Sequence, residues 1–249
     1  MTVPVADPRK PVTRPFARRR ASLFPPVIGC DEVGRGALCG PVVVAAVWFE
    51  PEALPKGVLG RLDDSKRVDP QEREALYPLI ARVARVSFAA RSARFIDVHN
   101  IRQATLAAMR QAVTRLELDA PVRIDGIDVP GGLPGDARAV IKGDATVPQI
   151  AAASIMAKVL RDRMMARLGT RYVDYLWHSN AGYGTRQHRA AIMKLGHTRH
   201  HRRSFGDLFA LLDDGSERLI AQPAPDAERL DGLLRVVDPQ DLHALGGAE

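Results

Sequence analysis

The sequence of 249 residues lacks any long hydrophobic run and has only two cysteines, Cys30 and Cys39. Its longest apolar stretch, Pro41 to Phe49, is nine residues, whereas a membrane-spanning helix needs about 20. No signal-like segment opens the chain, so we expect a cytoplasmic protein without membrane contact. Two cysteines are too few for a disulfide framework or for a zinc site of about four ligands. We therefore expect both cysteines to be reduced core residues.

Charge is distributed unevenly along the chain. Residues 1–20 carry six Lys or Arg and one Asp, residues 206–249 carry ten acids and three Arg, and the body between them has 27 basic and 18 acidic residues. We expect residues 1–25, rich in Pro and Arg, to form a disordered basic arm and residues 207–249 an acidic tail. The folded domain would span 26–206. Its basic excess suits a polyanion such as nucleic acid, although solubility alone can also account for it.

Short apolar runs alternate with helical patterns in this domain. Runs bounded by Gly or Pro predict buried strands, and apolar residues at helical spacing predict amphipathic helices. In chain order the pattern predicts strands at 27–30 and 42–49, a helix at 72–84, a strand at 83–91, a helix at 100–118 capped by Asn100, strands at 122–125 and 139–142, and a helix at 149–168 after Pro148. This order predicts an α/β fold with an antiparallel start and helical crossovers later. The polar, aromatic segment at about 168–206 predicts a smaller helical lobe.

Four carboxylates end or closely follow predicted strands. Asp31 and Glu32 follow the first strand, and Asp125 and Asp144 follow two later ones. Strand ends in α/β sheets gather ligand and catalytic groups, and converging acids repel one another unless a cation neutralises them. Oxygen ligands alone favour Mg²⁺ or Mn²⁺, and two such ions suit phosphodiester hydrolysis. A single acid at a strand end is more often only solvated, so the prediction depends on all four meeting.

The adjacent acidic pair sets a geometric condition. Successive side chains of a regular strand point to opposite faces, so Asp31 and Glu32 can serve one metal only if the backbone kinks there. The glycines at 29, 34 and 36 would make such a kink easy.

A glycine-rich turn follows the acids directly. Gly34-Arg35-Gly36 can present backbone N–H groups to a sugar or phosphate, because glycine has no side chain to block the approach. The run 29–36, with Gly40-Pro41-Val42-Val43 after it, resembles the opening signature of the type 2 ribonucleases H, specifically bacterial ribonuclease HII. The resemblance continues in order over roughly 27–206, through Asp64-Ser65-Lys66, Ile124-Asp125-Gly126, Lys142-Gly143-Asp144-Ala145, 151–158, Arg161-Asp162, Gly182-Tyr183-Gly184, His188 and His201-Arg202-Arg203-Ser204-Phe205.

The resemblance implies a fold, a reaction and a set of site residues. The fold is ribonuclease H-like, a five-stranded mixed sheet flanked by helices with a C-terminal helical region. The implied reaction is two-metal-ion hydrolysis of the RNA strand of RNA–DNA hybrids, and incision 5′ of ribonucleotides embedded in duplex DNA, giving 3′-OH and 5′-phosphate ends. The implied metal ligands and catalytic residues are Asp31, Glu32, Asp125 and Asp144, with Mg²⁺ or Mn²⁺ as cofactor. We expect a monomer.

The resemblance also implies how RNA is recognised. Gly34, Arg35 and Gly36 would read the 2′-OH at an RNA-to-DNA junction, and Tyr183 would stack on the sugar of the following deoxynucleotide. The 2′-OH is the group that distinguishes RNA from DNA at a given position. Turn and tyrosine together would allow incision beside a single ribonucleotide.

Further residues match family positions or lie near them. Lys66 and Lys142 match positions near the phosphates, and the other candidate substrate contacts are Ser154, Lys158, Arg161 and His188. Each also has a structural interpretation: a helical Lys or Arg usually faces solvent, and Ser154 can bond its own helix backbone. Asp162 can pair with a basic neighbour, the small residues 151–153 let their helix pack close to the sheet, and the cluster His197, His200 and His201 could bind metal or simply line a basic surface.

Three alternatives remain at this point. One is another nuclease of the same fold that acts on structured DNA, and a second is a non-catalytic nucleic-acid-binding protein. The related ribonuclease HIII is disfavoured because that family carries a substantial N-terminal domain, whereas about 25 residues precede the first predicted strand here. One departure from the family pattern is Ile127, which stands where an asparagine is usual, and we expect the following Asp128 to face solvent.

Overall fold

The computed structural model describes residues 14–133 and 136–205, and the acidic tail predicted at 207–249 lies outside them. Five strands form one mixed sheet in the order β3-β2-β1-β4-β5. β1 (Ile28–Val33), β2 (Val42–Trp48) and β3 (Arg85–Arg91) are antiparallel, whereas β4 (Val122–Asp125) and β5 (Ala137–Val140) continue the sheet parallel to β1. The predicted five-stranded α/β sheet is confirmed.

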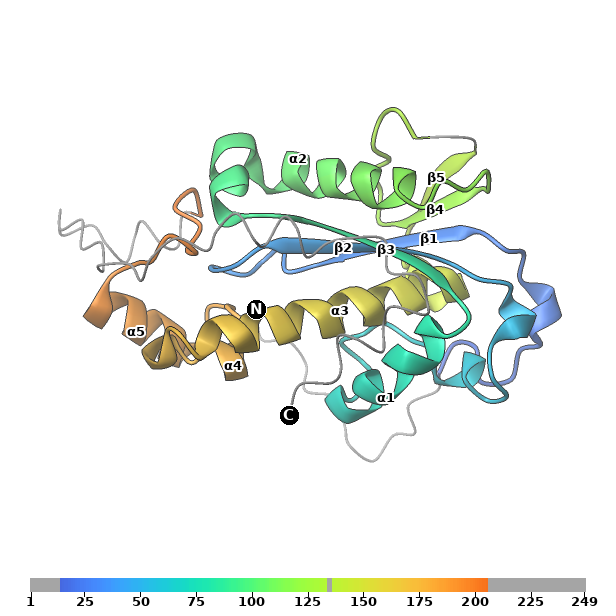
Figure 1. Cartoon of the computed structure of the whole chain (residues 1–249), viewed down its shortest axis with the longest axis horizontal. Helices are drawn as coiled ribbons and strands as arrows, with labels where there is room; N and C mark the ends of the chain where they lie inside the picture. The colour runs from blue at the N-terminus through green and yellow to red at the C-terminus, as the bar shows by residue number, and fades with distance from the viewer. Residues whose placement is uncertain (1–13, 134–135, 206–249) are drawn as a thin grey trace.

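Helices cover both faces of the sheet (Figure 1). α2 (Ala93–Thr114) lies on one face, and α1 (Pro70–Ala81) and α3 (Pro148–Gly169) lie on the other. Two short helices, α4 (Trp177–Asn180) and α5 (Arg186–Leu195), form the predicted C-terminal lobe. Single 3₁₀ turns connect these elements at η1 (Ala21–Leu23), η2 (Pro51–Ala53), η3 (Leu59–Arg61), η4 (Gly143–Ala145) and η5 (Val173–Tyr175). None of the helices in the described ranges combines the length and apolarity needed to cross a bilayer.

The central strand β1 packs closely on α3. Ala151, Ala152 and Ala153 are fully buried, so the prediction that these small residues let the helix approach the sheet is confirmed. Gly29 of β1 lies against the first turn of α3, where a Cβ built on it would stand 2.2 Å from the backbone carbon of Gln149. The strand that carries the acidic pair is therefore held in place by glycine-to-backbone packing.

We expect Gly29→Ala to lower the melting temperature by several degrees, because the added methyl group must push α3 away from the sheet. Overpacking of this kind costs about 1–3 kcal/mol, and 1 kcal/mol corresponds to roughly 2–4 °C in a domain of this size. Thermal unfolding followed by circular dichroism measures the change. Gly131→Ala is the matched control, since a Cβ there meets no atom within 4 Å, and equal melting temperatures for the two variants would contradict the close packing.

The helix predicted at 100–118 begins earlier than its apolar pattern indicated. α2 starts at Ala93, with the Ser92 hydroxyl accepting the Phe95 N–H at 3.3 Å. Asn100 interrupts it with φ of 64°, and the Asn100 side-chain oxygen accepts the Gln103 N–H at 3.0 Å. The predicted Asn100 cap is confirmed, but it caps the second segment of a kinked helix.

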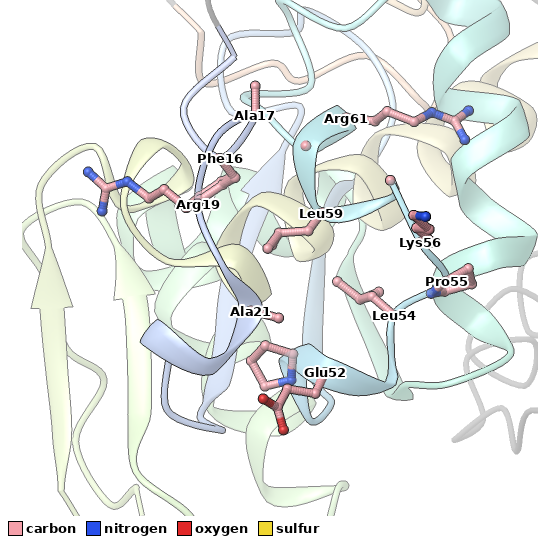
Figure 2. A pocket seen from close by; sticks show the side chains of 13 residues that line it. Phe16, Ala17, Arg19, Ala21, Glu52, Leu54, Pro55, Lys56, Leu59 and Arg61 are labelled. Atoms are coloured by element: carbon pink, nitrogen blue, oxygen red, sulfur yellow. The ribbon is translucent and has the colours of Figure 1, made fainter.

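The prediction that residues 1–25 form a disordered arm is wrong for residues 14–25. Phe16 is buried and meets Phe24 edge-on, with ring centroids 5.5 Å apart. Arg14 Nη1 donates to the Arg61 carbonyl oxygen at 2.6 Å. This segment and residues 51–61 line a pocket of about 490 Å³, which contains none of the four acids (Figure 2). Burial of one aromatic anchor orders a segment whose Pro and Arg content suggests disorder.

Candidate active site

Three adjacent parallel strands bring the predicted acids to one edge of the sheet. Cys30 pairs with Ile124, so Asp31 and Asp125 are the next residues of neighbouring strands. Asp125 is the last residue of β4, and its Oδ1 accepts the Gly143 N–H at 2.8 Å. This bond holds η4, which contains Asp144, beside the end of β4. The strands that carry Asp31 and Asp125, or precede Asp144, are therefore neighbours.

The backbone does not kink at Asp31 and Glu32, so the condition for both acids to serve one metal is not met. Both acids lie inside β1, and the register with β2 runs unbroken from Ile28 to Val33. The first positive φ is at Gly34, after the strand. The two carboxylates therefore leave opposite faces: Asp31 is buried towards α3, and Glu32 lines a pocket of about 180 Å³ on the α2 side.

As the side chains stand, no three His, Cys, Asp or Glu residues in the described ranges form a complete metal-ligand group. The reason is that the side chains of Asp31 and Glu32 point in opposite directions. Asp125 follows Ile124, which pairs with Cys30, and from this position its charge raises the pKa of both Asp31 and Glu32. The acids thus form one electrostatic group without converging on one point.

Burial and mutual repulsion make Asp31, Glu32 and Asp144 hard to ionise. Burial, followed by the charge of Glu32, raises the pKa of Asp31 well above its ordinary value. Burial also raises the pKa of Glu32, although Arg35 partly offsets this, donating to Glu32 Oε1 at 3.3 Å. Burial and the charge of Asp125 raise the pKa of Asp144 to about 6. The protein's own cations neutralise this group of acids only in part, which is the electrostatic condition expected of a cation site.

The shift at Asp144 predicts a dependence of stability on pH in the absence of divalent cations. The folded chain binds the Asp144 proton more tightly than the unfolded chain, so stability is lost as pH rises from about 4 through about 6. Asp144→Asn should therefore be more stable than the parent in EDTA at pH 8, by on the order of 1 kcal/mol once solvent screening is allowed for. Urea unfolding at pH 8 and at pH 4 measures this, and the advantage should vanish at the lower pH. An equal advantage at both pH values would contradict the electrostatic origin.

The Gly34-Arg35-Gly36 turn lies at the end of β1, next to the acids. Gly34 has φ of +90°, which favours glycine, and a Cβ there would stand 2.1 Å from Arg161 Nε. Arg35 and Gly36 are exposed, and a Cβ on Gly36 would meet no atom within 4 Å. The surface of the turn is therefore open to a ligand while its base is closely packed.

The C-terminal lobe places Tyr183 beside this turn. The Leu38 and Cys39 N–H groups donate to the Gly182 carbonyl oxygen at 2.9 and 3.2 Å. Tyr183 is half-buried, and its ring lies 5.8 Å from Lys158 Nζ and 5.3 Å from Arg161 Cζ. The predicted reading turn and the predicted stacking tyrosine thus belong to one surface.

The other predicted contacts near the acids fall into two groups. Lys66 is exposed, and its charge lowers the pKa of Glu32, so its ammonium group lies near the acids. Ser154 is buried beside Ser65, 2.9 Å between hydroxyl oxygens, and a hydrogen bond from Ser154 lowers the pKa of Asp31. Lys142 is exposed at φ of 55°, one residue before η4. Ser154 therefore supports an acid, whereas the two lysines face solvent.

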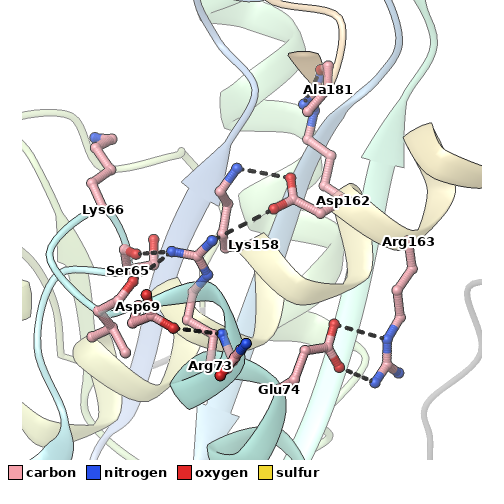
Figure 3. A network of polar contacts seen from close by, with 12 residues as sticks. Ser65, Lys66, Asp69, Arg73, Glu74, Lys158, Asp162, Arg163 and Ala181 are labelled. Atoms are coloured by element: carbon pink, nitrogen blue, oxygen red, sulfur yellow. Dashed lines mark hydrogen bonds and ion pairs between the residues drawn. The ribbon is translucent and has the colours of Figure 1, made fainter. Parts of the chain in front are cut away.

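Lys158 belongs to a polar network between α1 and α3 (Figure 3). Its Nζ donates to Asp162 Oδ1 at 2.7 Å, and Arg73 Nη2 lies 3.9 Å from Asp162 Oδ2. Arg73 also donates to the Ser65 carbonyl oxygen at 2.6 Å. Asp162 therefore pairs with basic neighbours, which was one of its two predicted roles.

Two predicted substrate contacts are buried instead. Arg161 is fully buried and donates to backbone carbonyl oxygens, so the prediction that it touches substrate is wrong. His188 is also fully buried: Trp177 Nε1 donates to its Nε2 at 3.0 Å, which leaves Nδ1–H to donate to the Tyr183 carbonyl oxygen at 2.9 Å. His188 cannot reach a phosphate in this position. It supports the backbone of Tyr183.

The histidine cluster is part of the lobe's core. His197 and His201 are buried, and burial lowers the pKa of His200 to about 4 and that of His201 to about 3. The rings of His200 and His201 are therefore neutral at physiological pH, and the prediction that the cluster lines a basic surface is wrong. Cys30 and Cys39 are free and buried, as predicted. Asp128 forms a two-bond ion pair with Arg102 of α2, at 3.0 and 2.7 Å.

Arg202 has no role predicted from the sequence, although it lies in a motif that matches the family. Arg202 is fully buried and donates to the carbonyl oxygens of Gly34, Arg35 and Gly40. The run His201-Arg202-Arg203 reads as a solvated basic patch, because nothing local distinguishes a buried Arg from its exposed neighbour. Only the long-range contact, across 168 residues, does so.

Solved structures share this architecture. The chain superposes on the ribonuclease HII of Archaeoglobus fulgidus, solved in a complex with PCNA, with a TM-score of 0.62 and 27% identity over 74% of this chain and 95% of that one. It superposes on ribonuclease H2 of Pyrococcus horikoshii with a TM-score of 0.64 and 22% identity, over 76% of this chain and 98% of that one. The sheet order and the acids at its edge define an enzyme of the ribonuclease H-like fold.

The sequence comparisons give the family. The family model described as Ribonuclease HII matches residues 28–208. A protein of Rhizobium leguminosarum bv. trifolii named Ribonuclease HII is 50% identical over 193 residues, covering 77% of this chain and 82% of that protein. The chain belongs to the ribonuclease HII family and is an endoribonuclease of the ribonuclease H type.

Proposed function

We propose that this enzyme hydrolyses the RNA strand of RNA–DNA hybrids and incises duplex DNA on the 5′ side of embedded ribonucleotides, leaving 3′-OH and 5′-phosphate ends. The observation that carries the proposal is the position of the Gly34–Gly36 turn at the end of the strand that holds Asp31 and Glu32. A turn that reads a ribose and acids that act on its phosphate are then separated by one residue, Val33. Since the scissile phosphate is attached to the 5′ oxygen of the ribose that is read, recognition and cleavage require this closeness.

The acidic residues fit a hard divalent cation, Mg²⁺ or Mn²⁺. Asp31, Glu32, Asp125 and Asp144 offer oxygen donors only, and burial with mutual repulsion raises the pKa of three of them. Two bound ions would supply a nucleophilic water and stabilise the departing oxygen. Because Asp31 and Glu32 leave opposite faces of β1, they would hold different ions, with Asp125 near both of them.

Residues around the acids have separate tasks in this proposal. Lys66 and Lys142 are exposed near the acids and would bind substrate phosphates. Gly36 and its exposed neighbour Arg35 would face the ribose, and the Tyr183 ring would stack on the next sugar. Ser154 would hold Asp31 in place through its hydrogen bond.

The test uses three end-labelled duplexes of one sequence: all DNA, DNA with a single ribonucleotide, and a full RNA–DNA hybrid. With Mg²⁺ or Mn²⁺ we expect cleavage of the second and third and a product ending 5′ to the ribonucleotide. Cleavage of the all-DNA duplex at a comparable rate would favour the alternative of a structure-specific DNA nuclease. Absence of metal-dependent cleavage of any duplex would overturn the proposal.

A further inference from the structure

Two arginines without a catalytic assignment lie beneath the proposed reading surface, which is formed by the Gly34–Gly36 turn and Tyr183. Arg161 comes from α3, Arg202 comes from the segment after α5, and both side chains are fully buried. A buried guanidinium is costly unless its N–H groups are satisfied. The acceptors of these two groups therefore show what the burial achieves.

All seven side-chain hydrogen bonds that the structure gives these arginines end on backbone carbonyl oxygens. Arg202 donates to Gly34 at 2.6 Å, to Arg35 at 2.8 Å, and twice to Gly40 at 3.0 and 2.9 Å. Its guanidinium thereby binds both ends of the loop that contains the Gly-Arg-Gly turn. The planar fork of an arginine can bind several carbonyls at fixed angles, which the single nitrogen of a lysine cannot do.

Arg161 connects the same loop to the tyrosine. Its guanidinium donates to the carbonyl oxygens of Cys39 at 3.1 Å and Pro41 at 3.0 Å, and also to that of Ala181 at 2.8 Å. Ala181 lies two residues before Tyr183, whose ring stands 5.3 Å from Arg161 Cζ. The Arg161 side chain thus binds the backbone of both parts of the reading surface, the loop of the turn and the segment before Tyr183.

An anchor outside the core fixes the position of Arg202. The Asp97 carboxylate of α2 accepts the N–H groups of Arg203 and Ser204 at 3.1 and 2.9 Å, and the Ser204 hydroxyl at 2.7 Å. Arg202 Cζ lies 5.1 Å from the Phe205 ring centroid. The segment after α5 is therefore fastened to α2, and Arg202 projects from it to the turn.

We propose that Arg161 and Arg202 are positioning residues that fix the Gly34–Gly36 turn and Tyr183 relative to each other, and thereby set the discrimination between ribose and deoxyribose. The inference rests on the proposed function. Neither guanidinium touches substrate, since both are buried. They act through the backbone carbonyls that they hold, so their loss impairs selectivity for a ribonucleotide more than affinity for duplex DNA.

The experiment measures dissociation constants in EDTA, by fluorescence anisotropy, for a duplex with one ribonucleotide and for the same duplex in all-DNA form. Arg202→Lys and Arg161→Met should reduce the parent's preference for the ribonucleotide by about tenfold, which corresponds to 1.4 kcal/mol. Affinity for the all-DNA duplex should change less than threefold. Arg163→Met is the matched control, because Arg163 lies on α3 in an exposed ion pair with Glu74.

Asp97→Ala provides a second test if the variants of the two buried arginines fail to fold. It removes the anchor of the 203–204 segment without changing either arginine, and should reduce the preference in the same direction. Equal loss of affinity for both duplexes, or full preference in Arg202→Lys and Asp97→Ala, would overturn the inference while leaving the proposed function intact. A parent enzyme that neither prefers nor cleaves the ribonucleotide duplex would overturn both.

Discussion

Asp31→Asn is expected to abolish cleavage while the protein still binds an RNA–DNA hybrid. Asp31 is buried at the centre of the acidic group, where it interacts with Glu32, Asp125 and Ser154. The amide keeps the shape and the hydrogen bond but removes the charge that would hold a cation. Loss of cation-based stabilisation is worth several kcal/mol, so we expect kcat to fall by on the order of 10³-fold. Hybrid affinity in EDTA should be equal or higher, because one negative charge facing the phosphates is gone.

The measurement compares single-turnover cleavage and anisotropy binding for the parent, Asp31→Asn and Asp119→Asn. Asp119 is an exposed acid in the loop before β4, so its variant controls for loss of one negative charge. The melting temperature of Asp31→Asn reports whether the fold is kept. Undiminished cleavage would remove Asp31 from the catalytic group. Loss of binding and cleavage together would show that Asp31 shapes the surface instead.

The strands could be predicted from the sequence because they depend on local patterns, namely short apolar runs. That Asp125 and Asp144 reach the same edge as Asp31 was implied by the resemblance to ribonuclease HII, since the pattern alone left open whether their strands are neighbours. The geometry of the acidic pair was harder to predict. Gly29 reads as a hinge for a kink, but it serves to admit the backbone of α3, at 2.2 Å from where its Cβ would stand. A glycine that permits bending and one that permits close packing look alike in sequence.

The roles of the basic residues could not be predicted for a similar reason. Lys66 and Arg161 both read as cations near a phosphate site, yet the first is exposed and the second is fully buried. The difference arises from three carbonyls, at positions 39, 41 and 181, that lie far from Arg161 along the chain. Burial of a polar side chain is decided by such distant partners, which local spacing does not reveal.

Tyr183→Ala is expected to impair incision at a single ribonucleotide by roughly 10- to 100-fold in kcat/KM, whereas Tyr183→Phe should stay within about threefold of the parent. Stacking of a base on an aromatic ring is worth about 1–3 kcal/mol; we expect the packing of a sugar on the ring to be of the same order, and phenylalanine keeps that ring. The backbone at 183 is fixed independently of the side chain, because His188 donates to its carbonyl oxygen and Arg161 binds Ala181. The alanine variant therefore removes the ring without releasing the loop.

The comparison of the two substitutions separates stacking from hydrogen bonding. If phenylalanine is as impaired as alanine, the hydroxyl group of Tyr183 carries the effect and the stacking interpretation fails. If alanine matches the parent, Tyr183 takes no part in recognition. A full RNA–DNA hybrid provides the internal reference, since most of its cleavage sites are followed by a ribonucleotide instead of a deoxynucleotide. Tyr183→Ala should therefore lose less activity on the hybrid than at a single ribonucleotide, which would assign the ring to reading the junction.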